Sequence, residues 1–331
     1  MAQLPYKILI ADSSIRPEGI AMVQAVAELT FLPPHAPERD LLEGAREADA
    51  ILARSARLSR AVIEGTRRLK IVSRHGVGVD SVDVAACSER GILVTITGDA
   101  NSEAVSEYAF GLLFAAARKI AAAHADFTAG QWRREKFPGV ELFGKTLGII
   151  GLGRIGSRVA KHAKGFDMTV LAYDPYADAE RARSLQVSLV DLKSLLSRAD
   201  FITIHTPLTA ETTRLIGPAE FAQMKPSAIV INVSRGALID EDALYRTLKN
   251  KRIAGAALDA FEKEPLPLDH PLRGLENLVM SPHIAGQTEE ALVRMSVGAA
   301  QNILRVLRGE VPDNVVNPEV LKTSFKPTRR N

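Results

Sequence analysis

Several features are scarce in this sequence, and each scarcity removes a class of protein. A single cysteine, Cys87, among 331 residues rules out an internal disulfide and suits a reducing compartment. The most apolar stretch, around residues 108–123, is interrupted by Arg118 and Lys119 and is too short to span a bilayer. The net charge of +3 comes from scattered cations apart from a short basic tail at 326–330. We therefore expect a globular cytoplasmic protein that binds neither nucleic acid nor membrane.

What the sequence does contain is an alternation of short apolar runs and helical patterns along nearly its whole length. This alternation is typical of βαβ units and parallel sheets. In the first hundred residues the predicted strands are 7–12, 28–32, 50–55, 70–75 and 92–95. Later strands are predicted at 146–150, 168–173, 187–190, 201–205, 228–233, 255–258 and 277–281. Helical periodicity covers 102–128, and a last helix is predicted from about Thr288 to Arg308.

These elements predict an α/β fold of two Rossmann-like or flavodoxin-like domains, each with a parallel sheet. The length of 331 residues is sufficient for two domains. We expect residues 1–100 and 288–331 to form a discontinuous substrate-binding domain, and residues 101–287 to form a nucleotide-binding domain. The last helix is assigned to the first domain because a helix directly after the last Rossmann strand often crosses back. The active site is expected in the cleft between the two domains.

A glycine-rich turn predicts what the second domain binds. The apolar run 147–150 leads directly into Gly151, Gly153 and Gly156, which open a helix over 155–164. The first glycine permits the tight turn, the second lets the backbone approach a pyrophosphate, and the third lets the helix pack closely on the strand. The N-terminus of the helix then offers unpaired N–H groups to the phosphates. The turn therefore predicts a dinucleotide site.

An acidic residue after the next strand indicates which dinucleotide is bound. Asp174 follows the strand 168–173 and stands eighteen residues after Gly156, close to the roughly 20 expected for the carboxylate that bonds the adenosine ribose. Its charge would repel a 2′-phosphate, and the next residues, Pro175 to Ala177, include no arginine. The sequence thus favours NAD over NADP, and no metal is expected.

Polar or glycine residues follow most strands of the second domain, at the sheet edge where open α/β sheets bind ligands. Besides the turn and Asp174, these residues are His205, Thr206, Pro207, Ser234, Arg235, Gly236, Asp259, Pro282 and His283. In the first domain Arg54, Ser55 and the segment 76–78 also come directly after strands. They would line the opposite wall of the expected cleft.

Three residues suit hydride transfer between a cofactor and a ketone. Arg235 could hold a carboxylate bidentately. His283 could protonate the developing alkoxide, because imidazole ionises near neutral pH, and Glu264 could accept a hydrogen bond from the other ring nitrogen. An arginine after a strand is also a common surface cation, and Glu264 could equally be a solvated carboxylate. Spacing alone leaves both interpretations open.

The order of the motifs resembles that of a known family. GLGRIG at 151–156, YDP at 173–175, HTPLT at 205–209, VSRGALID at 233–240, GAALDAFEKEPLP at 255–267 and SPHIAG at 281–286 are similar to the motifs of the D-isomer-specific 2-hydroxyacid dehydrogenases. The resemblance extends over about residues 7–312. Within the family the D-3-phosphoglycerate dehydrogenases are the most similar, through ARSA at 53–56, RHGVGVD at 74–80, NS at 101–102, WRREKF at 132–137 and ELFGK at 141–145.

The resemblance implies roles for individual residues. Arg235 matches the catalytic and substrate-binding arginine, Glu264 the glutamate that assists the histidine, and His283 the general acid/base. The implied cofactor-binding residues are Gly151, Gly153, Arg154, Ile155, Gly156, Asp174, His205, Thr206, Pro207, Val233, Ser234, Asp259, His283 and Gly286. Of these, Asp259 would lie near the nicotinamide carboxamide. The implied substrate-binding residues are Arg54, Ser55, Arg74, Val77, Gly78, Asn101, Arg134 and Arg235.

The resemblance also implies the reaction and the assembly. It implies NAD-dependent interconversion of a D-2-hydroxy acid and its 2-keto acid, with 3-phosphoglycerate and 3-phosphohydroxypyruvate as the most similar family substrates. It also implies a homodimer joined through about residues 102–145. Arg54, Arg74 and Arg134 would face a phosphate tail, whereas His75 stands where the family often has a small residue. Reduction of hydroxypyruvate or glyoxylate, sulfolactate dehydrogenase activity, and a non-enzymatic role like that of the NAD(H)-sensing corepressors with this motif set remain alternatives.

Overall fold

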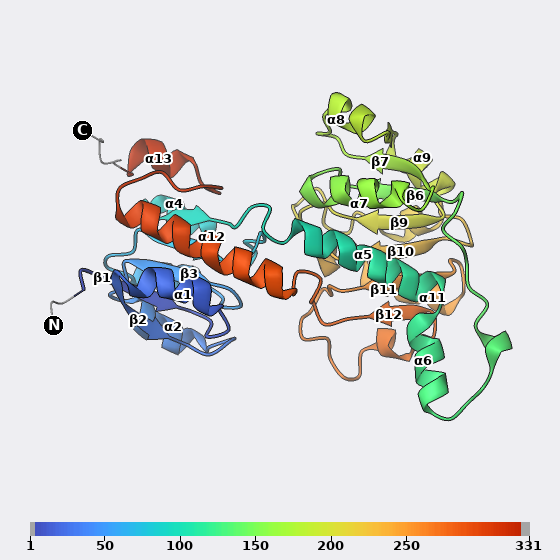
Figure 1. The fold of residues 1–331 in the computed structure, drawn as a ribbon, viewed down its shortest axis with the longest axis horizontal. Helices are drawn as coiled ribbons and strands as arrows, with labels where there is room; N and C mark the ends of the chain where they lie inside the picture. Colours follow the sequence, from blue (N-terminus) through green and yellow to red (C-terminus); the bar gives the residue numbers. More distant parts are fainter. Residues whose placement is uncertain (1–3, 326–331) are drawn as a thin grey trace. The chain divides into compact units, whose positions relative to one another are not determined.

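The computed structural model describes residues 4–325, which divide into two compact α/β units (Figure 1). The first unit contains the described residues up to Asn101 and those from Gln287 onward, and the second spans Ser102–Gly286. The basic tail at 326–330 lies outside the described residues. Within 4–325, no helix is long and apolar enough to cross a membrane.

The first unit is built on a parallel sheet with strand order β2-β1-β3-β4-β5. Its strands are β1 (Tyr6–Ile10), β2 (Ala27–Phe31), β3 (Ala50–Ala53), β4 (Ile71–Arg74) and β5 (Leu93–Thr95). Its helices are α1 (Pro17–Gln24), α2 (Glu38–Ala45), α3 (Arg60–Gly65), α4 (Val84–Glu89), α12 (Glu289–Leu307) and α13 (Glu319–Thr323). The strand order reverses between β1 and β3, so the carboxyl ends of these two strands form the switch point of the sheet.

Side chains that alternate along each strand bury both faces of this sheet. Ile8 and Ile10 of β1 pack in the cluster that contains residues of α12, whereas Leu9 packs in the cluster that contains residues of α2, α3 and α4. Helices α1 and α12 lie side by side on their face of the sheet (Figure 1). Helix α12 begins where Thr288 caps it, with the Thr288 hydroxyl accepting the N–H of Ala291 at 3.1 Å.

The second unit has a parallel sheet with strand order β12-β11-β10-β9-β6-β7-β8. Its strands are β6 (Thr146–Ile150), β7 (Thr169–Tyr173), β8 (Ser188–Leu189), β9 (Phe201–Ile204), β10 (Ile229–Asn232), β11 (Gly255–Leu258) and β12 (Leu278–Met280). Its helices are α5 (Ser102–Ala117), α6 (Ile120–Thr128), α7 (Arg154–Lys164), α8 (Ala179–Ser184), α9 (Leu192–Arg198), α10 (Pro218–Phe221) and α11 (Glu241–Lys249), and its 3₁₀ turns are η1 (Arg134–Lys136), η2 (Gly236–Leu238) and η3 (Pro271–Gly274). The predicted α/β class with two parallel sheets is confirmed.

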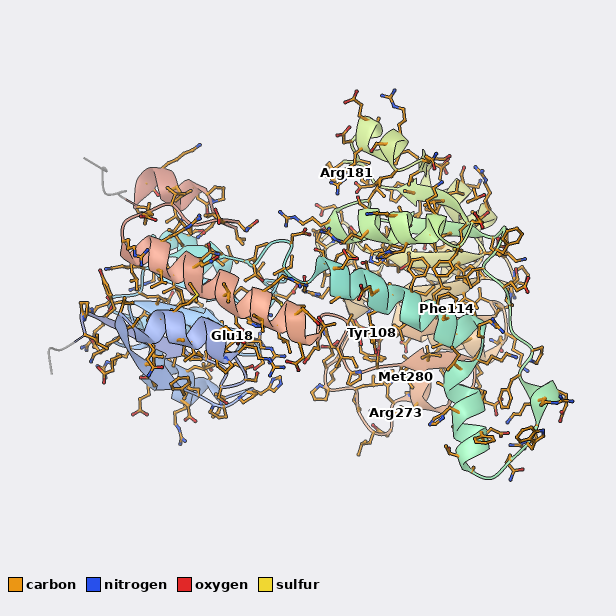
Figure 2. The ribbon with its side chains drawn as sticks, in the orientation of Figure 1. Glu18, Tyr108, Phe114, Arg181, Arg273 and Met280 are labelled. Carbon is orange, nitrogen blue, oxygen red and sulfur yellow. The ribbon has the colours of Figure 1, made fainter. Side chains whose placement is uncertain are left out.

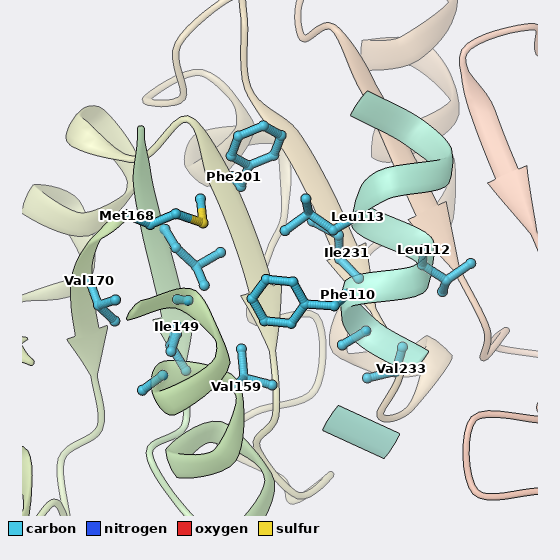
Figure 3. Close-up of a cluster of buried hydrophobic side chains, with 14 of the residues drawn as sticks. Phe110, Leu112, Leu113, Ile149, Val159, Met168, Val170, Phe201, Ile231 and Val233 are labelled. Atoms are coloured by element: carbon cyan, nitrogen blue, oxygen red, sulfur yellow. The ribbon is translucent and has the colours of Figure 1, made fainter. Parts of the chain in front are cut away.

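Helices cover both faces of the second sheet. On one face, Phe110 of α5 and Val159 of α7 meet Ile149 and Ile231 from the strands (Figure 3). The other face packs against α9, α10 and α11. Strands buried on both faces are nearly continuous apolar runs, which explains why they could be recognised in the sequence.

The helical stretch expected over 102–128 is interrupted. Helix α5 ends at Ala117 and α6 begins at Ile120, because Lys119 adopts a left-handed conformation with φ of 53°. The N–H of Val140 donates to the carbonyl of Ala117 at 2.9 Å and takes the place of a further helical bond. Helix α6 has no buried residue, so the break turns it away from the core.

Candidate functional site

The glycine turn between β6 and α7 has the geometry of a phosphate-binding turn. Gly151 has φ of 92°, and a Cβ there would lie 2.8 Å from the carbonyl of His205. A Cβ on Gly156 would lie 2.0 Å from the carbonyl oxygen of Gly151. Gly153 caps α7 without a side-chain bond, and a Cβ there would meet no described atom within 4 Å. Two glycines thus close the turn, and the third leaves space for a pyrophosphate at the start of the helix. Arg154 and Ile155 open that helix.

Asp174 lies directly after β7 and is tied to this turn. One carboxylate oxygen accepts the N–H of Leu152 at 2.8 Å, and the other accepts the N–H of Tyr176 at 2.8 Å. Each carboxylate oxygen can accept a second bond, so the group can still receive the hydroxyls of a ribose. The turn and Asp174 therefore fit an NAD molecule on chemical grounds.

The polar residues after β9 and β10 bond mainly within the sheet edge. His205 Nε2 meets the Thr203 hydroxyl at 2.8 Å, and burial lowers the pKa of His205 to about 3, so the ring is neutral at ordinary pH. The Ser234 hydroxyl donates to the carbonyl of Ile204 at 2.8 Å. Thr206 and Pro207 follow His205, and Val233 is buried beside Ser234.

Glu264 and His283 form a close pair. The distance between His283 Nδ1 and Glu264 Oε2 is 2.8 Å, and Glu264 Oε1 accepts the N–H of Phe261 at 2.9 Å. Burial raises the pKa of Glu264, but the hydrogen bonds from His283 and Phe261 and the positive charge of Arg235 outweigh it, so that this pKa lies below its ordinary value. With Nδ1 bonded to a carboxylate, the opposite nitrogen, Nε2, is the one able to exchange a proton with a substrate.

Asp259 holds the loop that carries His283. Its buried carboxylate accepts the Ser281 hydroxyl at 2.6 Å and the N–H groups of Ile284 and Ala285 at 2.9 and 2.7 Å. Its carbonyl accepts the N–H of His283 at 2.8 Å. His283 has φ of 54°, a conformation that costs about 1–2 kcal/mol for a residue other than glycine and that these bonds hold. The sequence pointed to Asp259 but not to this role.

Arg235 stands between β10 and η2, on a turn organised by Asn232. The buried amide of Asn232 donates to the carbonyl of Arg235 at 2.8 Å and accepts the N–H of Ser234 at 3.0 Å. Arg235 Nη1 also donates to the carbonyl of Ser234 at 2.8 Å. Asn232 could not be predicted from the sequence, because an amide at the end of a strand carries no signal of the bonds it makes.

Arg54 and Ser55, after β3, share a network with the buried Asp12 at the end of β1. The Ser55 hydroxyl donates to Asp12 at 2.6 Å. Arg54 donates to the Ser14 hydroxyl and, at 3.1 Å, to the side-chain oxygen of Gln287. The hydroxyl proton of Ser55 is thus donated to Asp12 and is not available to another acceptor.

The Asp12 carboxylate has further partners at its own turn. The backbone N–H of Ser14 donates to Asp12 at 2.9 Å, and the Ser14 hydroxyl also bonds to it. Burial raises the pKa of Asp12, but the bonds from Ser14 and Ser55 and the charge of Arg54 bring it below its ordinary value. The carboxylate is therefore charged and internally compensated.

The other residues expected at the substrate divide between the units. Arg74 ends β4 and donates to the carbonyls of Ala53 and His75 at 3.4 and 3.2 Å. Val77, Gly78 and Asn101 belong to the same unit, whereas Arg134 in η1 belongs to the other, as does Gly286, which was expected at the cofactor. The structure brings Arg54 and Arg74 into one unit but not Arg134.

His75 is buried beside α12. Its Nε2 lies 3.1 Å from the Ser296 hydroxyl and 3.3 Å from the carbonyl of Leu292. Burial lowers the pKa of His75 to about 4, with a contribution from the charge of Arg54. The histidine that departs from the family pattern is therefore a neutral packing residue.

Several known proteins are similar to this chain in sequence. Residues 110–285 match the NAD-binding domain of the D-isomer specific 2-hydroxyacid dehydrogenases. A D-3-phosphoglycerate dehydrogenase of Methanocaldococcus jannaschii is 47% identical over 313 residues, which cover 94% of this chain and 59% of that protein. A glyoxylate reductase of Korarchaeum cryptofilum is 40% identical over 311 residues, which cover 92% of this chain and 94% of that protein.

A solved structure gives the same result for the fold. The crystal structure of the TT0316 protein from Thermus thermophilus has a TM-score of 0.88 at 35% identity, and the match covers 94% of this chain and 99% of that one. The chain spans about three fifths of the length of the Methanocaldococcus relative. The matched segment is an NAD-binding domain, which confirms the predicted cofactor, NAD. This chain belongs to the D-isomer specific 2-hydroxyacid dehydrogenase family.

Proposed function

We propose that this chain catalyses the NAD-dependent interconversion of a D-2-hydroxy acid and its 2-keto acid, with 3-phosphoglycerate and 3-phosphohydroxypyruvate as the substrate pair. The observation that carries the proposal is the 2.8 Å pairing of His283 Nδ1 with Glu264 Oε2. The substrate pair is supported by the name of the relative that is 47% identical. This function accounts for a carboxylate, an imidazole and a guanidinium gathered at the ends of neighbouring strands.

The three side chains divide the chemistry of keto-acid reduction. Bound NADH supplies the hydride for the carbonyl carbon. His283 Nε2 donates a proton to the carbonyl oxygen as it becomes an alkoxide, and takes that proton back in the oxidative direction. Glu264 stabilises the charged imidazole through Nδ1, and Arg235 holds the substrate carboxylate bidentately. Acid–base assistance of this kind is worth roughly 10²–10⁴ in rate.

We further propose the unit spanning Ser102–Gly286 as the NAD-binding domain and the other unit as the substrate-binding domain. Asp174 would bond the adenosine ribose and disfavour a 2′-phosphate. Arg54, Arg74 and Arg134 would bind the phosphate tail of the substrate. The cytoplasm is the proposed location, where the single buried thiol of Cys87 stays unpaired.

The replacement His283→Ala tests the assignment of the acid. It should reduce turnover by at least about a hundredfold, while the dissociation constant of NADH stays nearly the same, because most of the residues expected to bind the cofactor are unchanged. Stopped-flow reduction assays and NADH fluorescence titration measure the two quantities. An active His283→Ala protein would remove His283 from the role of acid.

A second candidate function is the reduction of glyoxylate or hydroxypyruvate. It is favoured by the Korarchaeum glyoxylate reductase, of which the match covers 94%. NADH oxidation with 3-phosphohydroxypyruvate, hydroxypyruvate, glyoxylate and sulfopyruvate separates the candidates. Turnover confined to acids with a phosphate or sulfonate tail supports a role for the arginines, and turnover with none supports an NAD(H)-sensing binding protein.

We also propose a homodimer joined through about residues 102–145. Helix α6 has no buried residue in the chain itself. The side chains of Phe127, Trp132 and Phe143 are 62%, 76% and 72% exposed, and a second copy of this chain would cover them. Analytical ultracentrifugation should show a dimer for the native chain and a monomer for Trp132→Asp, and a monomeric native chain would refute the proposal.

A further inference from the structure

Glu241, the first residue of α11, is a buried carboxylate that the proposed mechanism does not use. Its side chain is 9% exposed. Glu241 Oε1 accepts the backbone N–H of Glu262 at 2.6 Å, and Glu241 Oε2 lies 3.6 Å from His270 Nε2. Both contacts are made with the segment between β11 and β12, which carries Glu264. A buried carboxylate is stable only where such partners compensate it.

The same segment is packed against the backbone next to Arg235. A Cβ on Gly236 would lie 1.9 Å from the carbonyl carbon of Phe261 and 2.1 Å from the nitrogen of Glu262. The peptide between Phe261 and Glu262 therefore rests directly on Gly236, while its N–H is bonded to Glu241. The preceding N–H, that of Phe261, donates to Glu264 at 2.9 Å.

We infer that Glu241 is a positioning residue for the Glu264–His283 pair. Three short contacts connect them in sequence: 2.6 Å from Glu241 to the Glu262 amide, 2.9 Å from the Phe261 amide to Glu264, and 2.8 Å from Glu264 to His283. Loss of the first contact leaves the Glu262 N–H without its acceptor and frees the turn from which Glu264 extends. The inference rests on the proposed function, in which His283 is the acid.

The groups around Glu241 affect its pKa and show which contact its carboxylate makes. Burial raises the pKa of Glu241, the Glu262 amide and His270 act in the opposite direction, and the carboxylates of Glu262 and Asp242 raise it again, so that it lies above its ordinary value. The Glu262 side chain points to Arg214 instead, with 3.4 Å between Arg214 Nη2 and Glu262 Oε1. The carboxylate of Glu241 therefore binds the backbone N–H of Glu262 in the turn and not a side chain of that residue.

Arg273 of η3, which is labelled in Figure 2, belongs to the same segment and bonds to the residues that follow Glu264. It donates to the carbonyls of Leu266 and Pro267 at 2.9 and 2.8 Å. The turn with Glu264 lies between these two attachments. Of the two, only the Glu241 contact adjoins Phe261, whose N–H bonds the Glu264 carboxylate, so its removal should affect the chemical step more.

Three variants test the inference by steady-state kinetics. Glu241→Ala removes the acceptor, and Glu241→Gln keeps a side-chain oxygen for the Glu262 amide. Glu220→Ala is the matched control, because Glu220 also accepts a backbone N–H near a helix start, from Gly217 at 3.0 Å. Glu241→Ala should lower kcat about tenfold, which is a part of the roughly 10²–10⁴ that acid–base assistance contributes, with the KM of the keto acid unchanged.

The controls distinguish positioning from general damage. Glu241→Gln should restore most of kcat, and Glu220→Ala should leave it at the native value. A double-mutant cycle adds Glu264→Gln: if Glu241 acts through Glu264, Glu241→Ala changes the kcat of that variant by less than about twofold. A further tenfold fall in the double variant, or equal changes in KM and kcat, would overturn the inference.

A readout that needs no turnover separates this inference from the proposed function. Diethyl pyrocarbonate acylates the free nitrogen of His283, and pairing of Nδ1 with a carboxylate increases the nucleophilicity of that nitrogen. At pH 8, mapped by mass spectrometry, acylation should be slower in Glu264→Gln and Glu241→Ala but not in Glu220→Ala. If the native chain reduces no keto acid yet shows this pattern, the proposed function is wrong and the positioning role of Glu241 is supported. If the native chain is an active dehydrogenase and His283 is acylated as fast in Glu241→Ala as in Glu220→Ala, the proposed function is supported and the positioning role of Glu241 is wrong.

Discussion

The two units carry different chemical groups in the turns where the strand order of their parallel sheets reverses. In each, the strand beside the reversal of strand order, β1 or β6, leads into a crossover helix. After β6 the turn contains Gly151 and Gly153, Gly156 lies in the first turn of α7, and α7 starts without a side-chain cap. After β1 the turn has no glycine before α1, and the buried carboxylate of Asp12 lies within it.

The start of α1 also differs from that of α7 in its donors. Pro17, the first residue of α1, has no N–H to offer, and the N–H of Arg16 donates to the Ser296 hydroxyl at 3.0 Å. A negative group in the turn and few donors at the helix disfavour a phosphate there. The turn, and not the α/β topology, therefore determines which unit can hold a dinucleotide.

The largest expected effect comes from Gly156→Ala. A Cβ at this position would lie 2.0 Å from the carbonyl oxygen of Gly151, so α7 must move away from β6. We expect a loss of about 3 kcal/mol or more in the stability of this unit, seen as faster hydrogen exchange in α7 and β6. Gly153→Ala is the control: its Cβ meets no described atom within 4 Å, so it should retain stability and weaken NADH. Equal stability losses in the two variants would contradict the different roles of Gly156 and Gly153.

Acid should destabilise the first unit through His75. Burial lowers its pKa to about 4 from 6.5, so the unfolded chain binds a proton before the folded chain does. Stability is then full above about pH 6.5 and declines as the pH falls toward 4, by up to about 3 kcal/mol. Urea unfolding between pH 7 and 4.5 should show this slope in the native chain and a smaller one in His75→Gln. The control His124→Gln, at an exposed site, should keep the native slope.

The sequence predicted the sheets and the cofactor because those signals are local. Strands buried on both faces are continuous apolar runs. Three glycines at this spacing between a strand and a helix are typical of a dinucleotide-binding turn. The break at Lys119 escaped prediction, because the carbonyl of Ala117 is bonded there by the N–H of Val140, more than twenty residues away.

Bonds from carboxylates to distant backbone groups escaped prediction for a related reason. Asp259 binds the N–H groups of Ile284 and Ala285, and Glu241 binds that of Glu262. Every residue except proline has such an N–H, so nothing in the sequence marks which one is used. The residues of the candidate site could therefore be named from motifs, but not the groups that hold them in place.

Asp12→Ala should affect the first unit alone. The variant removes the acceptor of the Ser55 hydroxyl and the Ser14 N–H, and we expect a loss of about 2 kcal/mol. Because the folded-state pKa of Asp12 is lowered, this contribution is present above the ordinary pKa of an aspartate and is lost at lower pH. Hydrogen exchange should increase near β1 and β3, while NADH affinity stays native. Weaker NADH binding would contradict the separation of the two turns.

Asp174→Asn should have the smallest effect of these variants, and it tests whether the charge of Asp174 determines the choice of cofactor. The amide oxygen can keep one of the two backbone bonds, from Leu152 or Tyr176, while the negative charge that disfavours a 2′-phosphate is removed. We expect NADH to bind about tenfold more weakly, or about 1.4 kcal/mol, and NADPH to bind equally well or better. Fluorescence titration with both cofactors measures the ratio. Equal weakening would mean that Asp174 only supports the glycine turn, much as Asp12 supports the turn after β1, and that cofactor choice lies elsewhere.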